Sequence, residues 1–111
     1  MEFIHIGGRL ASPDEPLRCA VFLSGSGSGM EALVLAQRTR HPLHRTAVVV
    51  SNRAEVGGVA RATRLGVPVE VVEQVHDGHR RSRAEHEEEI LHRLEQYEVE
   101  LIVLSGYMRL L

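Results

Sequence analysis

The sequence contains no lysine and no tryptophan, and all 13 basic residues among its 111 are arginine. Without lysine, the chain can neither form a Schiff base nor carry the lysine of a Walker-A phosphate loop. Aromatic residues make up only 4% of the chain, which argues against a stacking platform for single-stranded nucleic acid. The formal net charge is −2, so the basic field that would hold nucleic acid is lacking too.

Cysteine and long apolar runs are scarce as well. Cys19 is the single cysteine, which excludes an internal disulfide and fits a reducing compartment. The apolar runs stay far below the roughly 20 residues that a membrane-spanning helix needs. The first residues, Met1–His5, lack both the basic stretch and the long apolar stretch of a signal peptide. We therefore expect a cytoplasmic protein without a membrane partner.

What is present is typical of one globular domain. Hydrophobic residues make up 43% and charged residues 25% of the chain. The first 16 residues include a Gly-Gly pair and two prolines, and we expect an N-terminal extension or linker in which Phe3–Ile6 forms at most a short strand. Residues 17–111 carry the regular pattern and form the expected domain. Within it, the polar residues 73–81 are expected to be a loop.

From Leu17 onward, apolar patterns predict alternating strands and helices. Leu17–Ser24 is apolar on both faces, which is typical of a strand covered on both sides of a parallel sheet. The other expected elements are a helix over Met30–Arg40, a strand over Thr46–Ser51, a helix over Val56–Leu65 ended by Gly66, a strand over Val67–Val72, a helix over Ser82–Glu98 that opens with a capping box, and a strand over Leu101–Leu104. This βαβαβαβ order predicts a Rossmann-like, three-layer α/β fold with a parallel sheet.

A glycine–serine loop, Ser24-Gly25-Ser26-Gly27-Ser28-Gly29, lies between the first of these strands and the first helix. In an open parallel sheet, ligands bind beyond the carboxyl ends of the strands. Backbone N–H groups at a helix N-terminus attract an anion, and glycine lets the backbone approach it closely. The spacing differs from the G-x-G-x-x-G dinucleotide fingerprint. The loop therefore predicts a phosphate site; the alternative is a flexible turn without a ligand.

Histidines and arginines supply further candidates. His41 and His44, like His76 and His79, have the spacing of a metal-ligand pair, but no cysteine or carboxylate cluster completes four ligands. We interpret these histidines as solvated loop residues and predict no metal site. The basic run at residues 80–83 has two interpretations: it meets an anionic ligand, or it pairs with the glutamates of the following helix.

Four further stretches follow the glycine–serine loop in a distinctive order. They are Val50-Ser51-Asn52-Arg53-Ala54, the turn Ala62–Pro68, Ser82-Arg83 followed by Glu87–Leu91, and Val103–Leu111. Together with Val21–Ser28, they resemble the glycinamide ribonucleotide transformylases of purine synthesis over about residues 17–111. The last stretch is the most specific, because that family shows an apolar strand, a small residue, Gly, an aromatic residue, Met and Arg. The related formyltetrahydrofolate hydrolases share the fold, but the loop suits the transformylases better.

The resemblance implies a reaction and a set of binding residues. The reaction transfers a formyl group from 10-formyltetrahydrofolate to the amine of glycinamide ribonucleotide. By resemblance, Gly27, Ser28 and Gly29 hold the ribonucleotide phosphate, and Arg83 lies on the folate side. The expected lining of the folate pocket is Met108, Arg109, Leu110 and Leu111. The family also implies the strand order 3-2-1-4, counting strands from Leu17.

Two features differ from the family's pattern. Gly29 stands where the family usually has an asparagine, whose side chain could cap the helix. The family's catalytic Asn, His and Asp follow the Met-Arg segment, at which this sequence stops, so no residue here is assigned a catalytic role. We therefore expect the N-terminal half of a phosphoribosylglycinamide formyltransferase domain, inactive alone, with the C-terminal part of the family fold missing.

Two other functions stay open from the sequence. One is a non-catalytic phosphate-binding or interaction module that pairs with a complementary chain, and the other is a small phosphate-binding regulatory domain. The strand Leu101–Leu104 has no lysine, proline or inward charge to protect an exposed sheet edge. We therefore expect two copies to associate through this edge; the alternative is that Phe3–Ile6 folds back to cover it.

Overall fold

A five-stranded sheet forms the centre of the protein in the computed structural model, which describes residues 2–6, 9–12, 14–23, 25–39, 42–76 and 78–105. Its strands are β1 (Glu2–His5), β2 (Leu17–Leu23), β3 (His44–Ser51), β4 (Val69–Val71) and β7 (Leu101–Leu104). They lie in the order β1-β7-β2-β3-β4. Strands β7, β2, β3 and β4 are parallel to one another and confirm the predicted order 3-2-1-4, counted from Leu17. Strand β1 is antiparallel to β7, which makes the sheet mixed.

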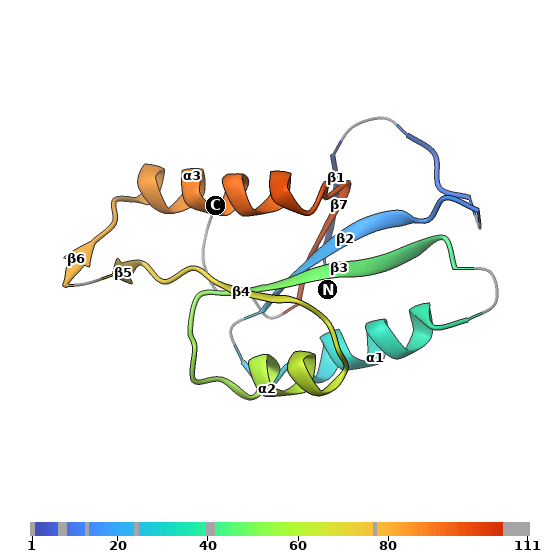
Figure 1. Cartoon of the computed structure of the whole chain (residues 1–111), viewed down its shortest axis with the longest axis horizontal. Coiled ribbons are helices and arrows are strands. Elements are labelled where there is room, and N and C mark those ends of the chain that lie inside the picture. Colours follow the sequence, from blue (N-terminus) through green and yellow to red (C-terminus); the bar gives the residue numbers. More distant parts are fainter. Residues whose placement is uncertain are drawn as a thin grey trace.

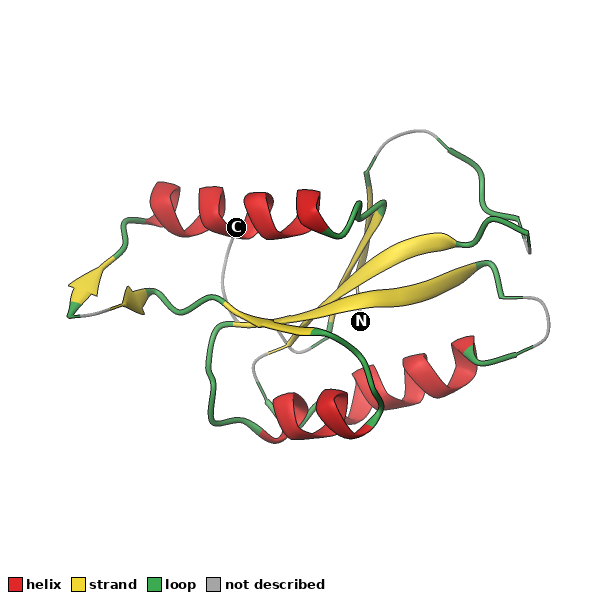
Figure 2. Ribbon diagram, viewed as in Figure 1, coloured by secondary structure: helices red, strands yellow, loops and turns green. Residues whose placement is uncertain are grey.

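Helices cover the sheet on both faces, as predicted (Figures 1 and 2). Helix α1 (Ser28–Gln37) and helix α2 (Gly57–Arg64) lie on one face, and helix α3 (Arg83–Gln96) lies on the other. Helix α1 begins two residues earlier than the apolar pattern indicated, so Ser28 and Gly29 belong to its first turn. Gly66 follows the end of α2 with a φ of +75°, the left-handed conformation expected of the residue that ends a helix.

The core consists of two apolar clusters separated by the sheet. Alternate residues of β2 point to opposite faces, so Cys19, Val21 and Leu23 pack towards α1 and α2 while Ala20 and Phe22 pack towards α3. All five are buried. This confirms the prediction that β2 is covered on both sides, and it explains why its sequence is apolar nearly throughout.

Helix α3 is fixed at its start and along one face. The Ser82 hydroxyl accepts the Glu85 N–H and the Glu85 carboxylate accepts the Ser82 N–H, which is the predicted capping box. His86 is fully buried on this face, and its Nε2 lies 2.8 Å from the carbonyl oxygen of Val72.

The segment predicted as a polar loop contains a small hairpin. Strands β5 (Val75–His76) and β6 (His79–Arg80) pair antiparallel. Gly78 has a φ of +76°, which a tight hairpin turn requires and glycine adopts without strain. The N–H of Arg81 donates to the Gln74 carbonyl oxygen at 2.6 Å and closes the base of the hairpin. Polarity hid this element because both faces of β6 are exposed.

The edge of β7 is not exposed, contrary to the sequence-based expectation. Strand β1 pairs with it over four residues, from Glu2 opposite Leu104 to His5 opposite Leu101. The Ile6 N–H extends the pairing by donating to the carbonyl oxygen of Glu100. The first residues thus satisfy the backbone groups that were expected to recruit a second copy. Self-association through this edge now requires that β1 first leaves.

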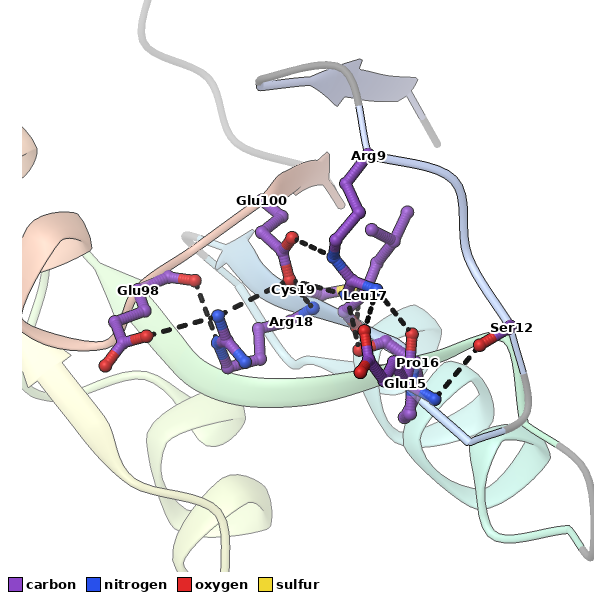
Figure 3. Close-up of polar contacts among 9 residues, drawn as sticks. All are labelled: Arg9, Ser12, Glu15, Pro16, Leu17, Arg18, Cys19, Glu98 and Glu100. Atoms are coloured by element: carbon purple, nitrogen blue, oxygen red, sulfur yellow. Dashed lines mark hydrogen bonds and ion pairs between the residues drawn. The ribbon is translucent and has the colours of Figure 1, made fainter.

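Arg9 joins described residues before β2 to Glu100, the residue before β7. Its guanidinium donates two hydrogen bonds to the Glu100 carboxylate, at 2.6 and 2.9 Å, and others to the carbonyl oxygens of Glu15 and Pro16 (Figure 3). Local sequence pattern does not reveal this contact, because the partner of Arg9 lies 91 residues away in the sequence.

Candidate functional site: an anion-binding loop

The glycine–serine loop lies where β2 ends and α1 begins, at the carboxyl edge of the parallel strands. A cavity of about 270 Å³ opens there, lined by Gly25, Ser26, Gly27, Ser28 and Gly29 and by Ser105. Two predicted site residues, Ser28 and Gly29, are on the first turn of α1, and Gly27 is its N-cap. The structure therefore brings Gly27, Ser28 and Gly29 together around one cavity.

Gly27 gives the loop its shape. Its φ is +79°, a conformation that glycine adopts readily and other residues rarely do. Its carbonyl oxygen accepts the Glu31 N–H at 2.8 Å and so starts the hydrogen bonding of α1. Gly27, as the N-cap, has no side chain with which to cap the first turn. The N–H groups of the first turn, which have no acceptor within a helix, can therefore point towards an anion.

Glycines and serines make up the described lining of the cavity, and none of these described residues is ionisable. Glu31 in the first turn of α1 would oppose an anion, but Arg61 of α2 forms an ion pair with its carboxylate. Among the described residues, the positive electrostatic field that favours an anion therefore comes from the N-terminus of α1, which carries about half a positive elementary charge.

Ser105 is a lining residue that sequence reasoning did not single out. It follows β7 directly, and its N–H donates to the Phe22 carbonyl oxygen at 2.8 Å. Because β7 lies beside β2, this bond brings Ser105 to the loop. The available signal was a small polar residue at the end of an apolar strand that neighbours the loop strand.

The structure does not bring Arg83 into this lining. Arg83 is exposed at the first residue of α3, and its Nε lies 3.1 Å from the Glu87 carboxylate, four residues further on. This is the pairing with helix glutamates that was one of two interpretations of the basic run. The remaining predicted folate residues, Met108, Arg109, Leu110 and Leu111, lie outside the described residues.

The expectation that the paired histidines lie in solvated loops is wrong for His44 and His79, which begin strands β3 and β6. His44 Nδ1 lies 2.8 Å from Gln37 Nε2, and His79 lies 3.6 Å from the Glu85 carboxylate. His41 and the His76 side chain are outside the part that the structure describes. In the described ranges, no three His, Cys, Asp or Glu side chains gather as a metal site requires.

Cys19 of β2 is buried beside Gln37, and this burial raises the pKa of its thiol to about 11. It packs as a small apolar residue, in agreement with its place in the strand pattern. Among the described helices, none is long and apolar enough to cross a bilayer.

Comparison with known proteins extends these observations. The formyl transferase family matches residues 17–111. The trifunctional purine biosynthetic protein adenosine-3 of Gallus gallus is 36% identical over 107 residues, which are 96% of this chain and 10% of that protein. The phosphoribosylglycinamide formyltransferase of Escherichia coli is 29% identical over 96 residues, which are 86% of this chain and 43% of that enzyme.

Solved structures agree with the sequence relatives. The crystal structure of phosphoribosylglycinamide formyltransferase from Brucella melitensis superposes with a TM-score of 0.80 at 36% identity, over 86% of this chain and 48% of that one. The chain thus spans about half the length of the single-function relatives and about a tenth of the trifunctional ones.

The parallel β7-β2-β3-β4 core, with helices on both faces and a glycine–serine loop after β2, defines a Rossmann-like α/β protein. Within that class, the match over residues 17–111 and the structural likeness decide the family. The chain belongs to the formyl transferase family.

Proposed function

We propose that residues 17–111 form the nucleotide-phosphate-binding half of a phosphoribosylglycinamide formyltransferase of cytoplasmic purine biosynthesis. The observation that carries the proposal is the cavity formed by the α1 N-terminus, residues 25–28 and Ser105 at the carboxyl edge of the sheet. In this function Gly27, Ser28 and Gly29 bind the phosphate of glycinamide ribonucleotide through backbone N–H groups and the Ser28 hydroxyl.

The second substrate is 10-formyltetrahydrofolate. The family resemblance assigns its side of the site to Arg83, Met108, Arg109, Leu110 and Leu111. Of these residues, Arg83 is exposed and paired with Glu87, and the other four lie outside the described residues. We therefore assign these residues to binding of the folate only, and we derive no chemical step from them.

The reaction joins the substrate amine to the formyl carbon through a tetrahedral intermediate, which needs stabilisation of an oxyanion and transfer of a proton. The cavity at the loop is lined by glycine and serine, residues suited to holding an anion. We assign this region the task of binding and orienting the ribonucleotide, and we assign it no proton transfer.

Titration of the labelled chain with ribose 5-phosphate, followed by amide NMR, tests the proposal. The amides of Ser26, Gly27 and Ser28 should shift most, and ribose without phosphate should leave them unmoved. A Gly27→Ala chain should lose this response, because a Cβ at Gly27 would lie 2.5 Å from the Gly58 Cα.

Gly66→Ala is the matched control for that variant. Gly66 has a similar positive φ, but an added Cβ meets nothing within 4 Å, so the backbone strain is comparable and the loop is untouched. This control should keep the response of the parent chain. Shifts confined to other loops, or a response that survives in Gly27→Ala, would contradict the proposal.

A further inference from the structure

The backbone of α2 packs directly on the backbone of the glycine–serine loop. The Gly58 N–H donates to the Gly25 carbonyl oxygen at 2.9 Å. A Cβ built on Gly27 would lie 2.5 Å from the Gly58 Cα, so no side chain fits between the two segments. The ion pair between Glu31 of α1 and Arg61 of α2 joins the same two helices one turn further along. The loop is therefore held between the helix that it starts and the helix that follows β3.

Neighbouring atoms occupy the space that a side chain on Gly58 would need. A Cβ there would lie 2.6 and 2.9 Å from the two methyl carbons of Leu23 and 3.0 Å from the Gly25 carbonyl oxygen. Leu23 is fully buried, so it cannot turn out into solvent to make room. The preceding residue differs: a Cβ on Gly57 would come no closer than 3.5 Å to Ser26, an ordinary contact.

We infer that Gly58 is a positioning residue for the phosphate site, acting through the loop and not through the ligand. Its bare Cα lets the loop approach α2, and its N–H binds the Gly25 carbonyl oxygen, a group that would repel a phosphate if it turned into the cavity. This inference rests on the proposed function for the identity of the ligand, but the placement of the loop can be measured without it.

Gly58→Ala and Gly57→Ala, made separately in the full 111-residue chain, test the inference. Without ligand, Gly58→Ala should shift the amides of Gly25, Ser26 and Gly27 well beyond the small shifts in Gly57→Ala. With ribose 5-phosphate as the probe, Gly58→Ala should bind about tenfold more weakly, whereas Gly57→Ala should stay within roughly twofold of the parent. Equal loop shifts and equal affinities in the two variants would overturn it.

A second pair of variants separates positioning from general loss of structure. Leu23→Val removes both methyl carbons that Gly58→Ala would strike, but leaves the contact with the Gly25 carbonyl oxygen. The double variant Leu23→Val/Gly58→Ala should therefore unfold at the same urea concentration as Leu23→Val alone. Its loop amides should still be displaced, and its binding of ribose 5-phosphate should still be weaker. If the loop amide shifts and the affinity of the double variant instead matched those of Leu23→Val alone, the effect would be due to Leu23 and the inference would be overturned.

The two proposals fail in different ways. If the parent chain does not respond to ribose 5-phosphate, the proposed function fails. The ligand-free amides of Gly58→Ala and Gly57→Ala then still decide whether Gly58 sets the position of the loop.

Discussion

Glu100 connects three parts of the chain through one carboxylate. It accepts two hydrogen bonds from Arg9 and one from the Arg18 N–H, and the Arg18 guanidinium lies 3.6 Å away. The hydrogen bonds from Arg9, followed by that from the Arg18 backbone and the two positive charges, lower the pKa of Glu100 from 4.5 to about 2. The side chain is only 17% exposed, so water screens these contacts less than it would at an open surface.

Glu100→Gln should lower the free energy of unfolding at pH 7 by about 1 to 3 kcal/mol, because the charge-assisted bonds to Arg9 are lost. The folded-state pKa lies below the unfolded value, so this stabilisation is complete above pH 4.5 and is lost as the pH falls towards about 2. Urea unfolding of parent and variant between pH 7 and pH 2 measures the difference, which should shrink in that window.

Glu98→Gln is the control for this prediction. Glu98 contacts Arg18 at 3.3 Å, but its side chain is 78% exposed, so the change should cost at most about 0.5 kcal/mol at any pH. If the Glu100→Gln difference stayed constant down to pH 2, the carboxylate charge would not be its source.

At the scale of elements, β1 is the segment that the sequence placed least well. Its four residues are exposed, and Phe3 and Ile4 keep 55% and 42% of their surface in water. Its stability therefore comes from pairing with β7 and from Arg9, both contacts distant in sequence. The neighbouring strands β2 and β7 were predicted within one residue because their apolar residues reveal burial on both faces.

Ile4→Pro should release β1. The Ile6 N–H donates to Glu100, and in an antiparallel pair every second residue faces the same way, so the Ile4 N–H also points at β7. Proline removes that donor. The amides of Leu101–Leu104 should then exchange faster, and the apparent mass in sedimentation at micromolar concentration should rise as free β7 edges pair.

Ile4→Val is the matched control, because it changes the same, partly exposed side chain but keeps the backbone N–H that faces β7. It should leave both exchange and mass unchanged. A mass that stays that of a monomer while the β7 amides lose protection would show that this edge does not recruit a second copy.

At the scale of the whole molecule, the described residues that line the proposed phosphate site include no group suited to proton transfer. The cavity at the loop is lined by glycine and serine, and Arg83 lies outside that lining. Without a positioned acid or base, such a reaction typically loses about 10²- to 10⁴-fold in rate.

We accordingly expect the 111-residue chain to show no transformylase turnover with 10-formyltetrahydrofolate and glycinamide ribonucleotide. A spectrophotometric assay of folate deformylation, with the Escherichia coli phosphoribosylglycinamide formyltransferase as positive control, measures this. Turnover near an ordinary enzyme rate of roughly 1 s⁻¹ would refute the expectation. Binding of ribose 5-phosphate by the same preparation would show that the chain is folded.

The sequence by itself determined the parallel α/β core and the place of the glycine–serine loop. Both follow from local pattern: apolar residues on both faces of β2, the capping box at Ser82, and glycine at the positive-φ residues 27 and 66. These signals lie within a few residues of the feature that they specify, so they can be read without knowing what packs nearby.

Only the tertiary structure decided which distant segments meet. The pairing of Arg9 with Glu100, the covering of β7 by β1, and the contact of Gly58 with the loop each join residues that local pattern cannot relate. Ser105 joins the loop cavity for the same reason, because β7 lies beside β2 in the sheet. Such contacts depend on the register and twist of the whole sheet, which no short stretch of sequence specifies.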